Sequence, residues 1–218
     1  MRRGTLCRLA LVVVLTVGGL SARAGADPPC RAEAPDWPLP GSSWVLARTA
    51  TGSFGSASHA VTIDLLGEQV WRGRRVMVLR EGPVRTYLDM RYRLLALEHG
   101  GRMQAVYEPF DPLFAWPLVV GRQWTGEYYV TGASGGSPRL MRFAYRVDAL
   151  EEVTVPAGRF VAFRVRRHDA TETIVCWWSP ELGIPIKMTR ERSRFDPLGP
   201  GSLLEELRSW RFNPGDEP

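Results

Sequence analysis

The feature that most constrains the fold is an alternation of apolar and polar residues with a period of two. In residues 141–148 every odd position is bulky and apolar, and three of the four even positions are charged. Residues 161–166 and 61–66 carry similar patterns, and short glycine-containing turns separate such runs. This alternation is typical of half-buried strands joined by local hairpins. We therefore predict an all-β domain, built as an antiparallel open barrel or a curved half-barrel.

The regular pattern begins at residue 41 and ends near residue 212, which predicts a single β-domain over 41–212. Residues 27–40 are rich in proline and form a leader with one bulky anchor, Trp37. Residues 213–218 are expected to be a disordered tail. In residues 203–210 the leucines fit a helix as well as a strand, and we favour a closing strand.

The same series of sequence features occurs in the first and in the second half of the chain. The tetrapeptide Gly41-Ser42-Ser43-Trp44 is followed 80 positions later by Gly121-Arg122-Gln123-Trp124. Each copy leads through a Gly/Ser-rich turn into an alternating strand, and then to a Gly-Arg turn. Internal duplication predicts two similar meanders closed around one core. The alternative is a single meander that reuses the same turn chemistry.

The first 26 residues have the organisation of a secretory signal peptide. Arg2, Arg3 and Arg8 precede an uncharged apolar run over 9–20, and small residues follow up to Ala26. The run is shorter than the roughly 20 residues that a membrane-spanning helix needs. We expect export and cleavage after Ala26, a periplasmic location with secretion as the alternative, and no transmembrane segment after cleavage.

Export changes how the net charge is interpreted. The formal charge of +5 comes from 28 basic and 23 acidic residues, and four of the arginines lie in residues 1–26. Without them 24 basic residues stand against 23 acidic ones, a balance that predicts no strong long-range field. No basic cluster is separate from acidic residues, so we predict that nucleic acid is not a partner.

Cysteine usage agrees with export. Cys7 would leave with the signal peptide, so Cys30 and Cys176 remain as a candidate disulfide. Such a pair can bridge in an oxidising compartment. The alternative is that Cys30 stays on an extended leader while Cys176 is a small buried apolar residue.

The sequence contains no pattern that specifies a reaction. Residues 132–136 match G-x-S-x-G, but Ser137-Pro138 and an alternating strand follow where a nucleophile elbow needs a helix. His59, His99 and His168 lack the spacing of a metal motif, and there is no phosphate loop or CxxC pair. We predict no catalytic residue, no metal, no cofactor and no enzymatic activity.

Aromatic residues are the candidate binding groups. Residues 107–117 contain three prolines, which exclude a helix or a central strand, together with Phe110, Phe114 and Trp116. Two interpretations stay open: the aromatic side chains plug one end of the sheet, or the segment is a lid over an apolar ligand. Adjacent Trp177 and Trp178 would point to opposite faces of their strand, so that one is presented at a surface or cavity.

The second half carries a local pattern that resembles a known family. Residues 155–160 read V-P-A-G-R-F, and residues 178–183 read W-S-P-E-L-G. With Gly121 and Trp124, they are similar to a family of exported bacterial all-β domains of unknown function. The resemblance covers residues 121–210 and implies a barrel or half-barrel in the cell envelope. It implies no catalytic residues.

These observations favour an exported, non-catalytic binding or chaperone-like domain that holds an apolar small molecule, a lipid or a partner's apolar segment. The candidate ligand-binding residues are Phe110, Phe114, Trp116, Trp177 and Trp178. One alternative is an envelope structural or assembly protein that pairs with another envelope protein through sheet edges. A second alternative is a hydrolase with a dispersed histidine and carboxylate site.

Overall fold

The computed structural model describes residues 31–133 and 135–215, and these residues form fourteen strands. The signal peptide, Cys7 and Cys30 lie outside the described residues. The strands are β1 (Arg31–Ala32), β2 (Ser43–Gly52), β3 (Ala57–Trp71), β4 (Arg74–Glu81), β5 (Val84–Asp89), β6 (Arg93–His99), β7 (Arg102–Pro112), β8 (Leu118–Val119), β9 (Gln123–Gly132), β10 (Arg139–Val155), β11 (Gly158–His168), β12 (Glu172–Ser179), β13 (Ile184–Arg192) and β14 (Gly201–Arg211).

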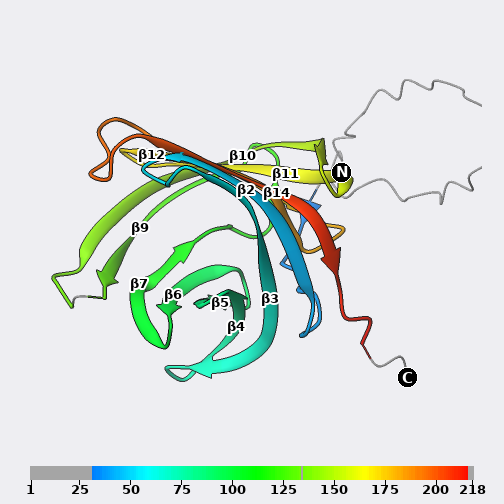
Figure 1. Ribbon diagram of the computed structural model, residues 1–218, viewed down its shortest axis with the longest axis horizontal. Coiled ribbons are helices and arrows are strands. Elements are labelled where there is room, and N and C mark those ends of the chain that lie inside the picture. The colour runs from blue at the N-terminus through cyan, green and yellow to red at the C-terminus, as the bar shows by residue number, and fades with distance from the viewer. Residues whose placement is uncertain (1–30, 134, 216–218) are drawn as a thin grey trace, which may run out of the picture.

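Twelve of these strands form one antiparallel barrel, which confirms the predicted all-β class. The barrel is closed, whereas the sequence suggested an open or half-barrel. Closure comes from two joints: β14 pairs with β2 over ten residues, and β7 pairs with β9 over four. Figure 1 shows β10–β12, β14 and β2 on the upper side, with β3–β7 curled beneath them. The short strands β1 and β8 pair separately.

The barrel consists of two consecutive six-stranded meanders, β2–β7 and β9–β14. The repeated tetrapeptides begin both meanders with the same type of backbone hydrogen bond. Gly41 and Gly121 have φ values of 86° and 87°, and their N–H groups donate to Leu65 and Val147 at 2.9 and 2.8 Å. A positive φ suits glycine because it has no Cβ. The duplicated order of features thus corresponds to a duplicated local structure.

The predicted alternation is present in β10. Phe143, Tyr145 and Val147 are buried, while Arg142 and Arg146 are exposed. In β11 both faces are buried near the hairpin, because Phe163 belongs to one core cluster and Phe160 to another. Residues 201–211 form a strand, as favoured from the sequence.

The leader and the tail are both attached to the barrel. Trp37 stacks on Tyr92 with ring centroids 3.8 Å apart, and its indole donates to the carbonyl of Met90. The backbone N–H of Asn213 donates to Ser42 Oγ at 2.9 Å, so the chain is still held where the tail was expected to begin. In the described ranges no helix has the length and apolar character needed to cross a membrane.

Substitution of Gly183 tests how tightly the leader packs. Gly183 has a φ of 67°, and a Cβ built there would lie 1.9 Å from the carbonyl oxygen of Asp36. Gly73 is a matched control, with a φ of 75° and open space around it. We expect Gly73→Ala to lower the free energy of unfolding by about 1 kcal/mol, from backbone strain alone. Gly183→Ala should cost at least about twice that, because the steric clash adds to the strain.

Urea denaturation of both variants and the wild type measures these costs. Equal losses at the two glycines would contradict the contact between the leader and the barrel.

Candidate functional site

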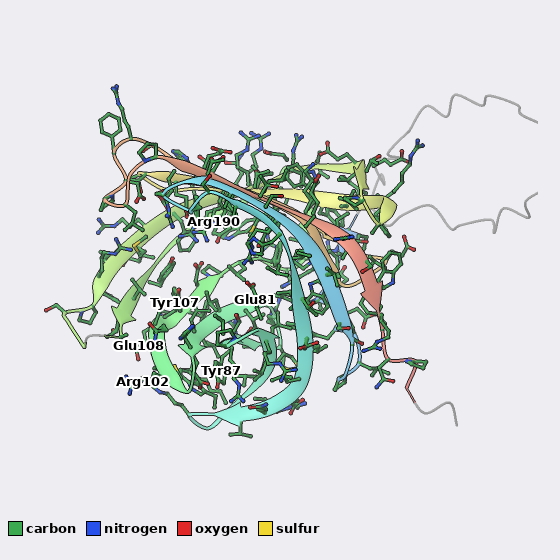
Figure 2. All side chains as sticks on the ribbon, in the orientation of Figure 1. Glu81, Tyr87, Arg102, Tyr107, Glu108 and Arg190 are labelled. Atoms are coloured by element: carbon green, nitrogen blue, oxygen red, sulfur yellow. The ribbon has the colours of Figure 1, made fainter. Side chains whose placement is uncertain are left out.

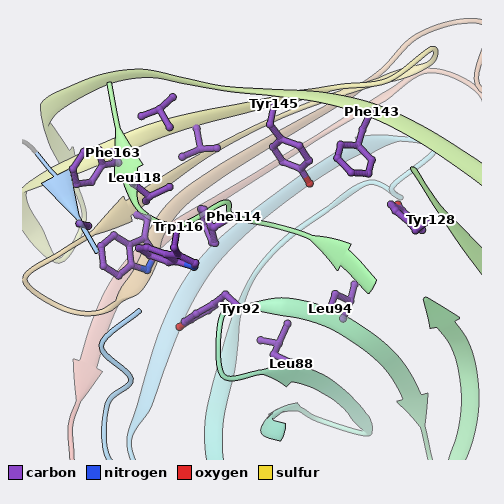
Figure 3. Packing of buried hydrophobic residues seen from close by; sticks show 14 residues of the cluster. Leu88, Tyr92, Leu94, Phe114, Trp116, Leu118, Tyr128, Phe143, Tyr145 and Phe163 are labelled. Carbon is purple, nitrogen blue, oxygen red and sulfur yellow. The ribbon is translucent and has the colours of Figure 1, made fainter. Parts of the chain in front are cut away.

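One end of the barrel is closed by an aromatic floor. The segment between β7 and β8 turns inward, so Phe114 and Trp116 are 4% and 5% exposed. Trp116 meets Trp178 edge to face at 4.9 Å, and Phe114 meets Tyr92 edge to face at 5.9 Å. The Trp116 indole donates to the Arg91 carbonyl at 3.0 Å. Figure 3 shows Trp116, Phe114 and Tyr92 gathered inside the ribbon.

The five predicted ligand-binding residues do not form one site. Phe114 lines the interior cavity, whereas Trp116 and Trp178 pack in the floor. Trp177 lies on the opposite face of β12 from Trp178, as expected from strand geometry, and its indole donates to Glu151 at 2.8 Å. Phe110 packs with a separate buried cluster around Val76 and lies under the Arg93 guanidinium. Trp116, Trp177, Trp178 and Phe110 are therefore outside the cavity wall.

Above the floor the barrel encloses a cavity of about 700 Å³. Both meanders supply apolar side chains to its wall, mainly Leu79, Leu88, Leu97, Met141, Val165 and Met188. A volume of this size is within the range of roughly 300–1,000 Å³ that is usual for small-molecule sites.

Strand register arranges the β11–β13 wall in rows. Nearest the floor, Phe163 pairs with Trp178. The next inward row joins Val165, Cys176 and Met188, and is apolar. The row above joins Arg167, Ile174 and Arg190, and is polar. On these three strands the wall is thus apolar toward the floor and polar toward the opposite end, which we call the mouth. On β14 the apolar row continues to Glu205, which is paired with Arg48.

Arg167 is the most buried arginine of the cavity wall. It donates from Nη1 to Asp111 at 3.0 Å and from Nη2 to the Tyr128 hydroxyl at 2.9 Å. The Tyr145 hydroxyl donates to the second oxygen of Asp111 at 3.3 Å. Burial raises the pKa of Tyr145 well above its ordinary value, so this hydroxyl stays protonated.

Burial is the largest influence on the acid of this network and raises the pKa of the Asp111 carboxyl. The charge of Arg167 and the hydrogen bonds from Tyr128 and Tyr145 offset only part of this rise. Burial by itself would lower the pKa of Arg167, but Tyr145, Asp111 and Tyr128 outweigh it, so the pKa is raised. Arg167 therefore stays a charged donor at any physiological pH.

Two further ionic groups line the cavity. Arg190 and Arg192 both donate to Glu172, at 2.8 and 3.3 Å. On the β2 side Arg48 donates from Nε to Glu205 at 2.6 Å and from Nη2 to Glu81 at 2.8 Å. Figure 2 shows Arg190 beneath the upper strands, with Tyr107 and Glu81 below it.

The rim of the mouth carries exposed apolar side chains. Phe195 and Leu198, in the turn between β13 and β14, are 71% and 68% exposed, and Leu198 also lines the cavity. Phe54, in the turn between β2 and β3, stacks under the Arg192 guanidinium at 3.8 Å. Apolar groups therefore border the polar mouth.

Cys176 belongs to the apolar row. Burial raises the pKa of its thiol to about 12, so the thiol is protonated at neutral pH and is a poor nucleophile. The disulfide predicted between Cys30 and Cys176 remains a prediction, since Cys30 lies outside the described residues.

The histidines stand apart from the cavity. His168 Nδ1 lies 3.0 Å from Thr173 Oγ1, and its exposed ring does not line the cavity. His59 and His99 are also exposed. Within the ranges 31–133 and 135–215, no histidine is paired with a carboxylate and no group of metal-binding side chains is assembled.

Sequence reasoning missed the polar half of the site. The signal that could have found it is the row at 161, 163 and 165, which continues on the same strand face to Arg167. Asp111 and Glu172 approach their arginines only through tertiary folding, so no local pattern marks them.

Comparisons with family models and with curated proteins give no match. Among solved structures, the chain is similar to a candidate exported protein with a YmcC-like fold from Bacteroides fragilis, with 12% identity, a TM-score of 0.40 and coverage of 84% of this chain and 100% of the other. A candidate lipoprotein from Parabacteroides distasonis is 9% identical with a TM-score of 0.37, and the match covers 83% of this chain and 99% of the other. The hypothetical lipoprotein YmcC from Escherichia coli is 10% identical with a TM-score of 0.34, and the match covers 78% of this chain and 85% of the other. The family suggested by residues 121–210 remains a prediction.

Truncation of the aromatic floor tests its structural role. Trp116→Ala removes a buried indole from between Phe114 and Trp178, and we expect it to lower the free energy of unfolding by about 3–5 kcal/mol. Trp210→Ala is the control, because Trp210 is 40% exposed and packs on Phe160 from outside the cavity. It should cost about 1–2 kcal/mol. Chemical denaturation measures both values, and a Trp116→Ala variant as stable as the wild type would exclude a role in the floor.

Proposed function

We propose that this protein is an exported, non-catalytic barrel that binds an apolar small molecule or lipid in its interior. The observation that carries the proposal is the cavity of about 700 Å³, whose wall is apolar over the part nearest the floor. A dry apolar wall favours an apolar guest, since burying its surface is favourable by about 25 cal/mol per Å². Location outside the cytoplasm rests on residues 1–26 alone.

The shape of the interior favours a small molecule over a partner's polypeptide segment. The floor residues Phe114, Trp116 and Trp178 are almost fully buried, so the cavity ends there. The floor therefore blocks this end of the cavity to a guest. An acyl chain can enter end-on from the mouth and stop at the floor, whereas an extended segment of another protein could not continue past it.

The other two hypotheses draw less support. Pairing through sheet edges predicts a filled barrel, and the interior is hollow. A dispersed hydrolytic site predicts a histidine against a carboxylate in a pocket, and the described contacts of His168 are with Thr173.

A cavity-filling substitution tests the proposal. Ile174 points into the cavity from β12, and its neighbour Val175 lies on the other face of the strand. Ile174→Trp should therefore reduce binding of the neutral fluorescent probe N-phenyl-1-naphthylamine at least about tenfold, through loss of free volume. Val175→Trp adds the same side chain outside the cavity and should leave the binding unchanged.

The measurement is fluorescence titration of the wild type and both variants, with thermal unfolding to confirm that each variant is folded. Native mass spectrometry of the protein purified from its own compartment then asks whether a guest co-purifies. No saturable probe binding to the wild type, or equal binding to the two variants, would refute the proposal.

A further inference from the structure

The polar row of the cavity holds two guanidinium groups at the boundary between the apolar wall and the mouth. Arg167 on β11 and Arg190 on β13 flank Ile174 on the strand between them, and both line the cavity. Neighbours across strands have Cβ atoms about 5 Å apart, so the two arginines are two such steps from one another. A head group over Ile174 would lie between the strands that carry the two guanidinium groups.

Each of these arginines keeps a buried donor without an acceptor in the described part of the protein. The Arg167 side chain is only 9% exposed, and its two Nη atoms donate to Asp111 and Tyr128 while Nε has no partner. Arg190 donates to Glu172 from Nη2, and its buried Nε also has no partner. A buried donor left unsatisfied is costly, and both Nε atoms are closed to solvent. A small shift of either guanidinium that brings Nε to an acceptor oxygen of a guest would therefore be favourable.

The carboxylates near this row are already engaged. Asp169 accepts the backbone N–H groups of Thr171 and Glu172, and Asp196 accepts from the Thr171 hydroxyl at 2.9 Å. Glu172 is shared by two arginines. Asp169 also pairs with Arg167 at 3.6 Å, whereas the printed hydrogen bonds of Asp196 come from neutral groups. An arriving anion would therefore meet arginine donors and acids that already accept hydrogen bonds.

The cavity charge also includes a cation outside these pairs. Arg139 lines the mouth and forms no salt bridge with the described residues. It adds positive charge at the end of the cavity through which a guest enters. A cationic head group would face four arginines at the mouth, and Asp196 is the one acid of the described cavity lining that forms no salt bridge.

Starting from the proposed function, on which this step rests, we infer that the guest is an amphiphile with an anionic head, a carboxylate or a phosphate. Arg167 and Arg190 bind this head, and the chain of the guest lies along the apolar wall. Carboxylate and phosphate oxygens form the strong charge-assisted hydrogen bonds for which arginine is suited. The chain then passes Val165, Cys176 and Met188 toward the aromatic floor.

The head group is tested by competition at pH 8, where a carboxylic acid is ionised. The competitors are dodecanoate, dodecyl phosphate and dodecanol. Each is titrated, below its aggregation concentration, against N-phenyl-1-naphthylamine bound to the full chain. We expect at least one of the two anions to compete at a concentration at least about tenfold lower than dodecanol. Comparison of the two anions identifies the preferred head. Acetate and inorganic phosphate, which lack the chain, should not displace the probe.

Variants assign the preference to the row. Arg190→Gln should reduce the anion-to-alcohol preference to near one, and Arg190→Lys should retain part of it, because the charge remains without the fork of donors. Glu172→Gln should increase the preference, since it removes a carboxylate that competes with the head group for Arg190. Arg142→Gln is the control on the outer face of β10, where the side chain is 75% exposed, and it should match the wild type. The preference is the ratio of the alcohol and anion concentrations that displace the probe from the same variant, so a change in probe affinity affects both concentrations and cancels.

The outcomes separate the two proposals. If the wild type binds the probe but dodecanol competes as well as both anions, the anionic head is excluded and the apolar cavity function stands. If the probe does not bind at all, both proposals fail. A preference that persists unchanged in Arg190→Gln would overturn the assignment to this row.

Discussion

The structure depends on how a twelve-stranded sheet can close on itself. About eight strands enclose an interior that side chains just fill, and the barrel diameter grows with strand number. Twelve strands therefore leave a space that wall residues cannot occupy alone. Here the segment over 113–117 enters from one end and places Phe114 against Trp116, and Trp116 against Trp178. Because this floor fills only part of the interior, the remainder is a cavity of about 700 Å³.

The same geometry explains why the charged residues of the interior are tolerated. An isolated charge in an apolar interior is very costly unless it is paired and hydrogen-bonded. Arg167 satisfies this requirement through Asp111 and Tyr128. The network spans β7, β9, β10 and β11, so it ties the short β7–β9 joint to the second meander. A polar cluster at this position contributes to barrel closure as well as to the chemistry of the cavity.

Much of the fold could be predicted because period-two patterning and glycine turns are local properties of the sequence. The alternation over 141–148 identified β10, and the repeated Gly-x-x-Trp tetrapeptides marked the start of both meanders. Closure could not be predicted, because it depends on pairing between strands far apart in the chain, such as Ser43–Gly52 with Gly201–Arg211. The aromatic residues were identified as a group, but local sequence does not reveal which of them reach the cavity.

The site was less predictable because its polar row is assembled from residues that look solvent-exposed in the sequence. Arg164 and Arg166 lie on the outward face of β11, and their residue type does not distinguish them from Arg167, which is buried. Only the parity of the strand places Arg167 on the inward face with Phe163 and Val165.

The two meanders share a scaffold but contribute differently to the cavity. The mouth arginines Arg139, Arg167, Arg190 and Arg192 all lie on strands of the second meander. The first meander faces them with leucines at 79, 88, 94 and 97, and its Glu81 is already paired with Arg48. The apolar residues of the wall, in contrast, come from both meanders, with Leu79, Leu88 and Leu97 from the first and Val165, Cys176 and Met188 from the second. An asymmetric distribution of arginines over a shared apolar wall suits an asymmetric guest. In the proposed complex the second meander therefore binds the head group, and both meanders contact the chain.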